Sequence, residues 1–203
     1  MYRIAAGARA ALAPSRVLAA LLLPGLLALA GAAPAAERRE LAYWEHGSWR
    51  VAMIEQVGVD IRQCEVFTGG DGNGSLRITV GEGGSDAALT WLPVWFRGME
   101  QPITLDDEMV LLLDGQESPL SGAMEVFEGP DEYGEPSVDA SLGSADVPEA
   151  VRALRAGNVL VAGARREGAL RVIDTWLLDG FTAAWLKASE WCGFDPRAAF
   201  RAP

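Results

Sequence analysis

The sequence predicts a mainly β domain: an antiparallel β-sandwich or a barrel-like sheet, with a short helix and a C-terminal helix packed on it. Three observations support this fold class. Short segments that alternate apolar and polar residues recur along the chain, and clusters rich in glycine, proline or aspartate separate them. Helical spacing of apolar residues occurs in two places, residues 146–157 and 179–192. Apolar residues make up 50% of the chain, which is enough to build a core.

Residues 1–36 are typical of a signal peptide. Three arginines accompany an apolar run, residues 17–29, and small residues near Ala35 offer a cleavage site. Proline and glycine interrupt the run, which is shorter than the roughly 20 residues of a membrane-spanning helix. We therefore expect residues 37–203 to form a single β-rich domain without a stable membrane span, and the protein to be periplasmic or secreted.

The charge of the chain argues against one large class of partners. Its formal net charge is −11, from 28 acidic and 17 basic residues. Removal of the three arginines of residues 1–36 lowers the basic count from 17 to 14 and the charge to −14. A protein that neutralises phosphates along nucleic acid needs clustered positive charge, and the arginines here are scattered. We therefore expect no binding to nucleic acid.

Alternation predicts the strands in chain order. The predicted segments are residues 49–57, 62–68, 76–80, 87–96, 103–105, 108–113, 122–127, 158–164 and 169–176. A glycine-rich stretch, residues 69–74, joins the second and third segments as a strand, turn, strand unit. Pro93 makes the fourth segment an edge strand or breaks it. Residues 109–113 are apolar on both faces, so we expect this strand to be central.

A long loop and a short helix follow. Residues 128–145 are rich in glycine, proline, serine and acidic residues, and we expect them to form an acidic, solvated loop. Asp146 and Glu149 resemble a capping box, and Pro148 stands in the first turn. Gly157 then closes the predicted helix.

The clearest helix signal lies at residues 180–192. Its apolar residues recur at i, i+3, i+4, i+7 and i+11, which is one face of a helix: Phe181, Ala184, Trp185, Ala188 and Cys192. Asp179 can cap the first turn, and Gly193 can end the helix in a left-handed conformation. We expect this face to pack on the core of the sheet.

The two cysteines, Cys64 and Cys192, predict one disulfide. An exported protein folds in an oxidising compartment, and an even number of cysteines leaves none unpaired. The two residues are 128 positions apart, so the bridge would contribute about 4–5 kcal/mol in the chain-entropy model. Two buried free thiols are the alternative.

Seven tryptophans mark either the core or a contact surface. Three of them lie on predicted core faces: Trp49, Trp176 and Trp185. Trp91, Trp95 and Phe96 stand on either side of Pro93 and form a candidate binding patch for a sugar, a lipid or a protein. Consecutive aromatic residues of a strand point to opposite faces, so burial of part of this set is the alternative.

Four acidic residues suggest a hydrolase as an alternative function. Asp106, Asp107, Glu108 and Asp114 could supply the pair of carboxylates that glycoside hydrolysis requires. Neighbouring residues of a strand point to opposite faces, so Asp107 and Glu108 would not converge. We therefore expect solvated turns here and no catalytic residues.

Motifs for metals and nucleophiles are incomplete. Oxygen donors within residues 71–82 are spaced like the ligands of a calcium loop between two helices. Leu76 stands where that loop needs glycine, and the flanks alternate like strands, so a hairpin turn is the better interpretation. His46 is the single histidine, and no Gly-x-Ser-x-Gly elbow is present. We expect no metal and no cofactor.

Several short segments resemble a known family. They are residues 49–51, Cys64, residues 110–115, residues 157–161 and the sequence Leu-Leu-Asp-Gly-Phe-Thr-Ala-Ala at 177–184. The last is similar to the Ser-Leu-x-Gly-Phe-x-x-Ala ending of the invasion-associated locus B-like proteins of the bacterial periplasm. The resemblance spans roughly residues 49–192, although typical members carry further cysteines in the middle region. It implies an exported β-rich envelope protein without established catalytic residues, linked in some members to host-cell entry.

Together these observations favour an exported, non-enzymatic envelope protein that acts by binding or structural association. Its partner, an envelope protein or a ligand, is not identified by the sequence. The alternative is a periplasmic hydrolase that uses paired carboxylates near residues 106–114.

Overall fold

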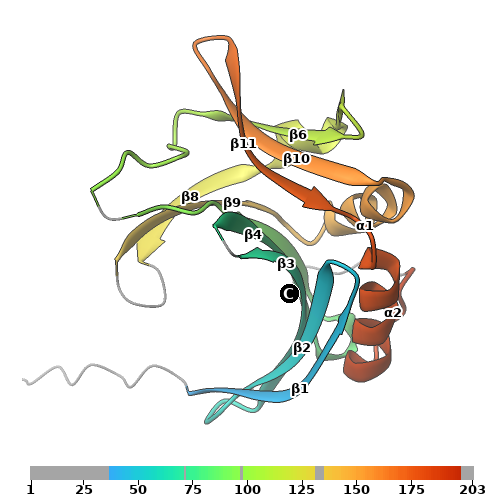
Figure 1. Ribbon diagram of the computed structural model, residues 1–203. Helices are drawn as coiled ribbons and strands as arrows, with labels where there is room; N and C mark the ends of the chain where they lie inside the picture. The colour runs from blue at the N-terminus through green and yellow to red at the C-terminus, as the bar shows by residue number, and fades with distance from the viewer. Residues whose placement is uncertain (1–36, 71, 97, 131–134, 198–203) are drawn as a thin grey trace, which may run out of the picture. The chain divides into compact units, whose positions relative to one another are not determined.

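Two antiparallel sheets account for most of the chain that the structure, a computed structural model, describes (Figure 1). The described residues are 37–70, 72–96, 98–130 and 135–197, and they belong to one compact unit, Ala35–Pro203. The predicted signal peptide, residues 1–36, lies outside them.

The larger sheet has seven strands. Their order is β1 (Arg38–His46), β2 (Trp49–Gln56), β3 (Ile61–Gly70), β4 (Asn73–Gly81), β5 (Ala87–Leu92), β9 (Pro136–Leu142) and β8 (Glu125–Pro130). The smaller sheet has four strands. Their order is β11 (Ala169–Leu177), β10 (Val159–Arg166), β6 (Glu108–Leu113) and β7 (Gln116–Glu117). The helices are α1 (Val147–Ala156), α2 (Phe181–Cys192) and two 3₁₀ turns, η1 (Glu82–Gly84) and η2 (Pro119–Ala123).

This architecture confirms the predicted fold class and decides between its two forms. Within the described residues, β1 and β8 are the opposite edges of the larger sheet and do not pair with each other. The smaller sheet and both helices cover one face of it, so the fold is a sandwich with an added helical layer and not a closed barrel. Neither α-helix of the described chain has the length and apolar composition of a membrane span.

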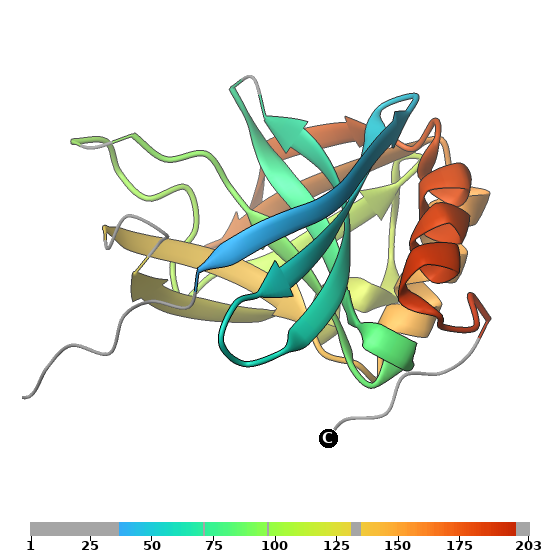
Figure 2. The same ribbon diagram turned by 90° about the horizontal axis from the view of Figure 1, so that it is seen from below.

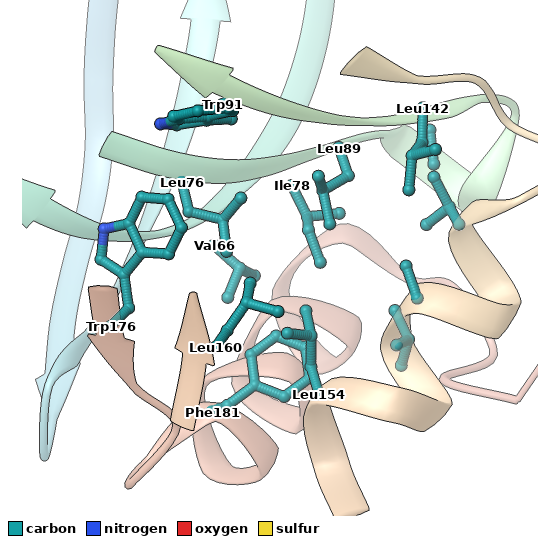
Figure 3. Packing of buried hydrophobic residues seen from close by; sticks show 14 of the residues in the cluster. Val66, Leu76, Ile78, Leu89, Trp91, Leu142, Leu154, Leu160, Trp176 and Phe181 are labelled. Carbon is teal, nitrogen blue, oxygen red and sulfur yellow. The ribbon is translucent and has the colours of Figure 1, made fainter. Parts of the chain in front are cut away.

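The core follows from the strand register. One row of directly opposite residues crosses five strands of the larger sheet, and all its members are buried: Val51, Val66, Ile78, Leu89 and Leu142. Directly opposite residues share a face, so the row forms one continuous apolar surface. Figure 3 shows the groups that pack against this surface: Leu160 and Trp176 from the smaller sheet, Leu154 from α1 and Phe181 from α2.

Helix α2 carries the apolar face that the sequence predicts, and it lies alongside β2 and β3 (Figures 1 and 2). Cys192 on this face forms a disulfide with Cys64 of β3, with a Cα–Cα distance of 6.0 Å, which confirms the predicted bridge. Gly193 ends the helix in the left-handed conformation, also as predicted. The expected cap by Asp179 is wrong: the N-cap is Gly180, and no side chain accepts a hydrogen bond from the first turn.

A close backbone contact joins the start of α2 to the turn between β1 and β2. Ser48 N donates to Asp179 O over 3.0 Å. Gly47 and Gly180 both have positive φ, and a Cβ atom on either would collide with backbone of the facing segment. Only glycine meets both requirements here, so these two positions bring the first hairpin and the last helix together.

One predicted boundary is wrong in an informative way. Residues 128–145 do not form a loop, because β8 continues to Pro130 and β9 runs over Pro136–Leu142. Val138, Ala140 and Leu142 alternate inward on β9 and are buried. The sequence of β9 does alternate between inward and outward positions. Most of the alternating residues are alanine, serine or acidic residues, and this composition is why the segment is predicted to be a loop. Residues 131–134 lie outside the described chain.

Other elements differ in smaller ways. The segment before residue 49, for which no strand is predicted above, forms an edge strand, β1. Residues 103–105 form no strand, even though Ile103 is fully buried. The short helix α1 is confirmed, but the Asp146 side chain makes no capping hydrogen bond. Residues 109–113 are confirmed as central, because β6 lies between β10 and β7.

Candidate ligand-binding site

The segment after β5 leaves the sheet and exposes large apolar side chains. Strand β5 ends at Leu92, immediately before Pro93, which has no N–H to continue the ladder. The segment then turns at Phe96, whose carbonyl accepts a hydrogen bond from Met99 N over 3.0 Å. Phe96 is 60% exposed and Met99 64% exposed.

A hydrogen bond within the turn fixes the ring of Trp95. Its Nε1 donates to Met99 O over 2.8 Å, while the residue as a whole is half-buried. The hydrogen bond therefore fixes the orientation of the indole ring beside the two exposed side chains, Phe96 and Met99. A ring that is already oriented loses little conformational entropy when a partner binds.

These residues form one wall of a cleft of about 310 Å³. Arg171 and Ile173 of β11 form part of the opposite wall, and the buried Asp174 borders the cleft. Arg171 Nη2 donates to Pro102 O, which holds the hairpin of β10 and β11 against the segment that follows Met99. Apolar side chains thus line the cleft together with a cation, Arg171, and an anion, Glu100.

Asp174 links the two sheets behind the cleft. Its carboxylate accepts from Gly74 N over 2.7 Å and from Trp91 Nε1 over 2.8 Å. Trp176 Nε1 in turn donates to Gly74 O over 2.9 Å. A Cβ atom at Gly74 would collide with the Asp174 carboxylate, so glycine is required there. Both carboxylate oxygens thus have partners, which is what a buried charge needs.

The predicted binding patch stays a prediction, and its three members differ in exposure. Trp91 is fully buried, and its inclusion in an exposed patch is wrong. It stands opposite Leu76 and Ala140 on the core face of β5, whereas Trp95 and Phe96 follow the break at Pro93. The structure places three residues beside them that sequence reasoning missed: Met99, Arg171 and Asp174. Asp174 shares a face of β11 with Trp176, so an acid at an inward strand position was the available signal.

Three of the four acids considered for catalysis, Asp107, Glu108 and Asp114, form ion pairs or hydrogen bonds with the backbone. Asp107 accepts two hydrogen bonds of 2.7 Å from Arg166, and this contact holds the pKa of Asp107 below its usual value. Glu108 pairs with a different cation, Arg165, over 2.6 Å. The backbone N–H groups of Val159 and Asn158 lower the pKa of Asp114 in the same way. Asp107, which precedes β6, and Glu108, the first residue of β6, therefore serve separate ion pairs.

The calcium-like spacing within residues 71–82 belongs to a hairpin. Strands β3 and β4 pair from Gln63 opposite Gly81 to Gly70 opposite Asn73, which confirms the turn interpretation. Asp71 lies outside the described residues. Across the described ranges, no group of three or more histidine, cysteine or acidic side chains is placed to hold a metal ion. His46 stacks on Trp44 at the end of β1, with ring centroids 5.6 Å apart.

Comparison with known proteins adds no family to this description. No protein-family model, no curated protein and no solved structure matches the chain. The resemblance to the invasion-associated locus B-like proteins therefore stays a prediction.

Proposed function

We propose that the protein is an exported, non-enzymatic component of the cell envelope that binds a ligand or a partner protein through the cleft beside Trp95. One observation carries this proposal: Phe96 and Met99 are exposed at the edge of a cleft of about 310 Å³. Grouped apolar side chains exposed beside a recess are a recurring feature of binding surfaces.

The two walls of the cleft suit a ligand with one apolar side and one polar side. An aromatic or aliphatic group would pack on Phe96 and Met99, where removal of apolar surface from water drives binding. Arg171 and Glu100 line the cleft as well and offer a cation and an anion to polar groups. Trp95, already fixed by its bond to Met99 O, would act as the rigid anchor.

The electrostatics of the acids support binding over hydrolysis. A carboxyl group that acts as a general acid near neutral pH needs a raised pKa. The contacts of Asp107 and Asp114 lower their pKa values instead. These two groups are thus suited to hold strands together as anions.

Two features support export. The disulfide between Cys64 and Cys192 is a bond that persists in oxidising compartments and is rare in the cytosol. Residues 1–36 have the composition of a signal peptide. The resemblance to the invasion-associated locus B-like proteins fits the same location and is part of this proposal.

The test is a quantitative pull-down from envelope fractions with the disulfide-bonded protein as bait. The partner that wild-type protein captures is identified and its affinity measured with purified components. We expect Phe96→Ala to weaken this affinity by about tenfold or more, because an aromatic anchor typically contributes 2 kcal/mol or more.

A matched control is Phe127→Ala on β8. This variant removes another phenylalanine, which is 47% exposed and far from Phe96 in the sequence. It should leave the affinity unchanged. Equal affinity of wild-type protein and Phe96→Ala, or an equal loss in both variants, would contradict the proposed role of the cleft.

A further inference from the structure

The face of the larger sheet that points away from the core carries a row of polar residues with one aromatic ring. Directly opposite residues on five strands form this row: Arg50, Phe67, Arg77, Thr90 and Ser141. Figure 1 shows the sheet curved, with α2 beside its convex side, so the row lies on the concave side. We call Arg50, Phe67 and Arg77 the arginine–phenylalanine row.

The guanidinium groups of both arginines lie over the ring of Phe67, which stands between them. The Cζ atom of Arg50 is 5.4 Å from the centre of the Phe67 ring, and that of Arg77 is 6.0 Å from it. A guanidinium over an aromatic ring is attracted by the negative charge on the ring face. This contact holds two cations on either side of β3, Arg50 on β2 and Arg77 on β4.

The hydrogen-bonding capacity of Arg77 is incompletely used. Its Nε is buried and has no hydrogen-bond partner. Arg77 forms an ion pair with the buried Glu65, but the distance of 3.6 Å from Nη1 to the carboxylate oxygen is beyond that of a good hydrogen bond. Glu65 is instead bonded by Arg38 over 2.5 Å and by Gln63 over 3.0 Å. An unpaired buried donor is costly, so a group that accepts a hydrogen bond from Arg77 Nε would be stabilised there.

Arg50, unlike Arg77, has no carboxylate partner among the described residues. Its Nη2 donates to a backbone carbonyl, that of Gly69, over 2.5 Å, and it forms no ion pair with an acid of the described residues. Other arginines of the same domain do: Arg165 and Arg166 each contact two acids. In a chain with a net charge of −11, two cations that share one aromatic ring are a distinctive feature, because Arg50 has no acidic partner among the described residues and Arg77 has only the long contact with Glu65.

We propose that the arginine–phenylalanine row binds an oxyanion, a carboxylate or a phosphate, carried by a small organic molecule. The planar guanidinium group matches both anions through paired N–H donors. Thr90 and Ser141, half-buried in the same row, add hydroxyl groups on the β5 side. The organic part of the ligand would lie against the exposed part of Phe67.

The ends of the row limit the size of the ligand. Glu45 of β1 stands opposite Arg50, and Glu125 of β8 stands opposite Ser141. Acidic residues thus flank both ends of the row, which suits one anionic group and disfavours a long polyanion. The row shares no residue with the cleft beside Trp95, so this site is independent of the function proposed above.

The experiment is a two-dimensional NMR titration of the protein with phenyl phosphate, benzoate and inorganic phosphate, at constant ionic strength. The signals followed are the arginine Nε–H groups and the backbone amides of β3 and β4. We expect saturable shifts at Arg50 and Arg77, and we expect Arg77→Gln and Arg50→Gln each to raise the Kd by about tenfold. The three probes distinguish an organic phosphate, an organic carboxylate and free phosphate as sources of the anion.

The matched control is Arg155→Gln, which removes the same charge from an exposed position on α1. It should bind like wild-type protein, and an equal loss in this variant would reduce the effect to general attraction and overturn the proposal. Arg77→Lys keeps the charge and loses the fork, so its affinity should lie between those of wild-type protein and Arg77→Gln.

Two further results would also overturn the site. One is the absence of saturable shifts with all three probes up to about 10 mM, where a site with a Kd of about 1 mM would be mostly occupied. The other is unchanged affinity in Arg77→Gln. If Arg77→Gln does not fold, as judged by its amide spectrum, Arg50→Gln decides the question by the same criterion.

Discussion

Trp91 and Trp95 are four residues apart and have opposite roles. The indole of Trp91 is fully buried, and its N–H bonds Asp174, a residue 83 positions away on the other sheet. The indole of Trp95 is half-buried, and its N–H bonds the carbonyl of Met99, four positions away. The long-range bond holds two sheets together, whereas the local bond shapes one turn. Trp91 thus maintains the fold, whereas Trp95 forms part of a surface.

Pro93 is the physical cause of this difference. Trp91 and the residue on either side of it still belong to β5, where register decides which side chains face the core. Pro93 cannot donate to the ladder, so the residues after it are released from that register. Trp95 and Phe96 are free to form the wall of the cleft as a result.

The largest expected effect comes from removing the long-range indole. We predict that Trp91→Ala lowers the free energy of unfolding by about 4–6 kcal/mol, because it leaves a large cavity and removes a donor from the buried Asp174 carboxylate. Trp91→Phe fills most of the cavity but leaves the carboxylate without that donor, so its loss should be smaller, about 1–3 kcal/mol. Denaturant unfolding measures both. A loss below about 1 kcal/mol for Trp91→Ala would contradict the role of Trp91 in holding the two sheets together.

The disulfide is a second long-range link, and its removal should have the next largest effect. We predict that Cys192→Ser lowers the free energy of unfolding by about 2–5 kcal/mol and makes the C-terminal segment the first site of proteolysis. Denaturant unfolding and limited proteolysis followed by mass spectrometry test this. Two alkylatable thiols in the native protein as isolated would show that the bridge does not form in the cell.

A third long-range link, between Asp107 and Arg166, should show itself through pH. Because the pKa of Asp107 is lower in the folded protein, the ion pair stabilises the fold at neutral pH, and this contribution is lost as pH falls below about 4. We predict that Asp107→Asn costs about 1–2 kcal/mol at pH 7 and that the difference from wild-type protein shrinks in acid. Unfolding curves recorded between pH 7 and pH 3 measure the difference. A gap that stays constant with pH would contradict the assignment.

The smallest effect on stability is expected at Trp95. We predict that Trp95→Ala changes the free energy of unfolding by less than about 1 kcal/mol, since its ring is half-buried and its bond is local. The same variant should lose affinity for the partner of the cleft. If Trp95→Ala destabilises the protein as much as Trp91→Ala, the distinction between the two tryptophans fails.

Patterns that are local in sequence were predictable. The apolar face of α2, its end at Gly193 and the orientation of Cys192 toward the core depend on helical spacing alone, and the structure confirms them. The burial of Trp91 depends on which residues stand opposite it on β4 and β9, and register between strands is not written in a single segment. The cleft is harder still, because its walls come from residues more than 70 positions apart, such as Trp95 and Arg171.

The contact at the paired glycines, Gly47 and Gly180, has a consequence for how the chain folds during synthesis. The first hairpin meets the last helix at this contact, and the bridge from Cys64 to Cys192 repeats the connection a few turns further along. Trp49, on the first hairpin, also packs edge-on against Phe181. The apolar side of the first hairpin therefore stays uncovered during synthesis until the last residues of the domain have emerged. Before α2 has been synthesised, Trp49 and Val51 expose an apolar surface to chaperones and proteases. A chain that ends before residue 180 should therefore be degraded and should not accumulate.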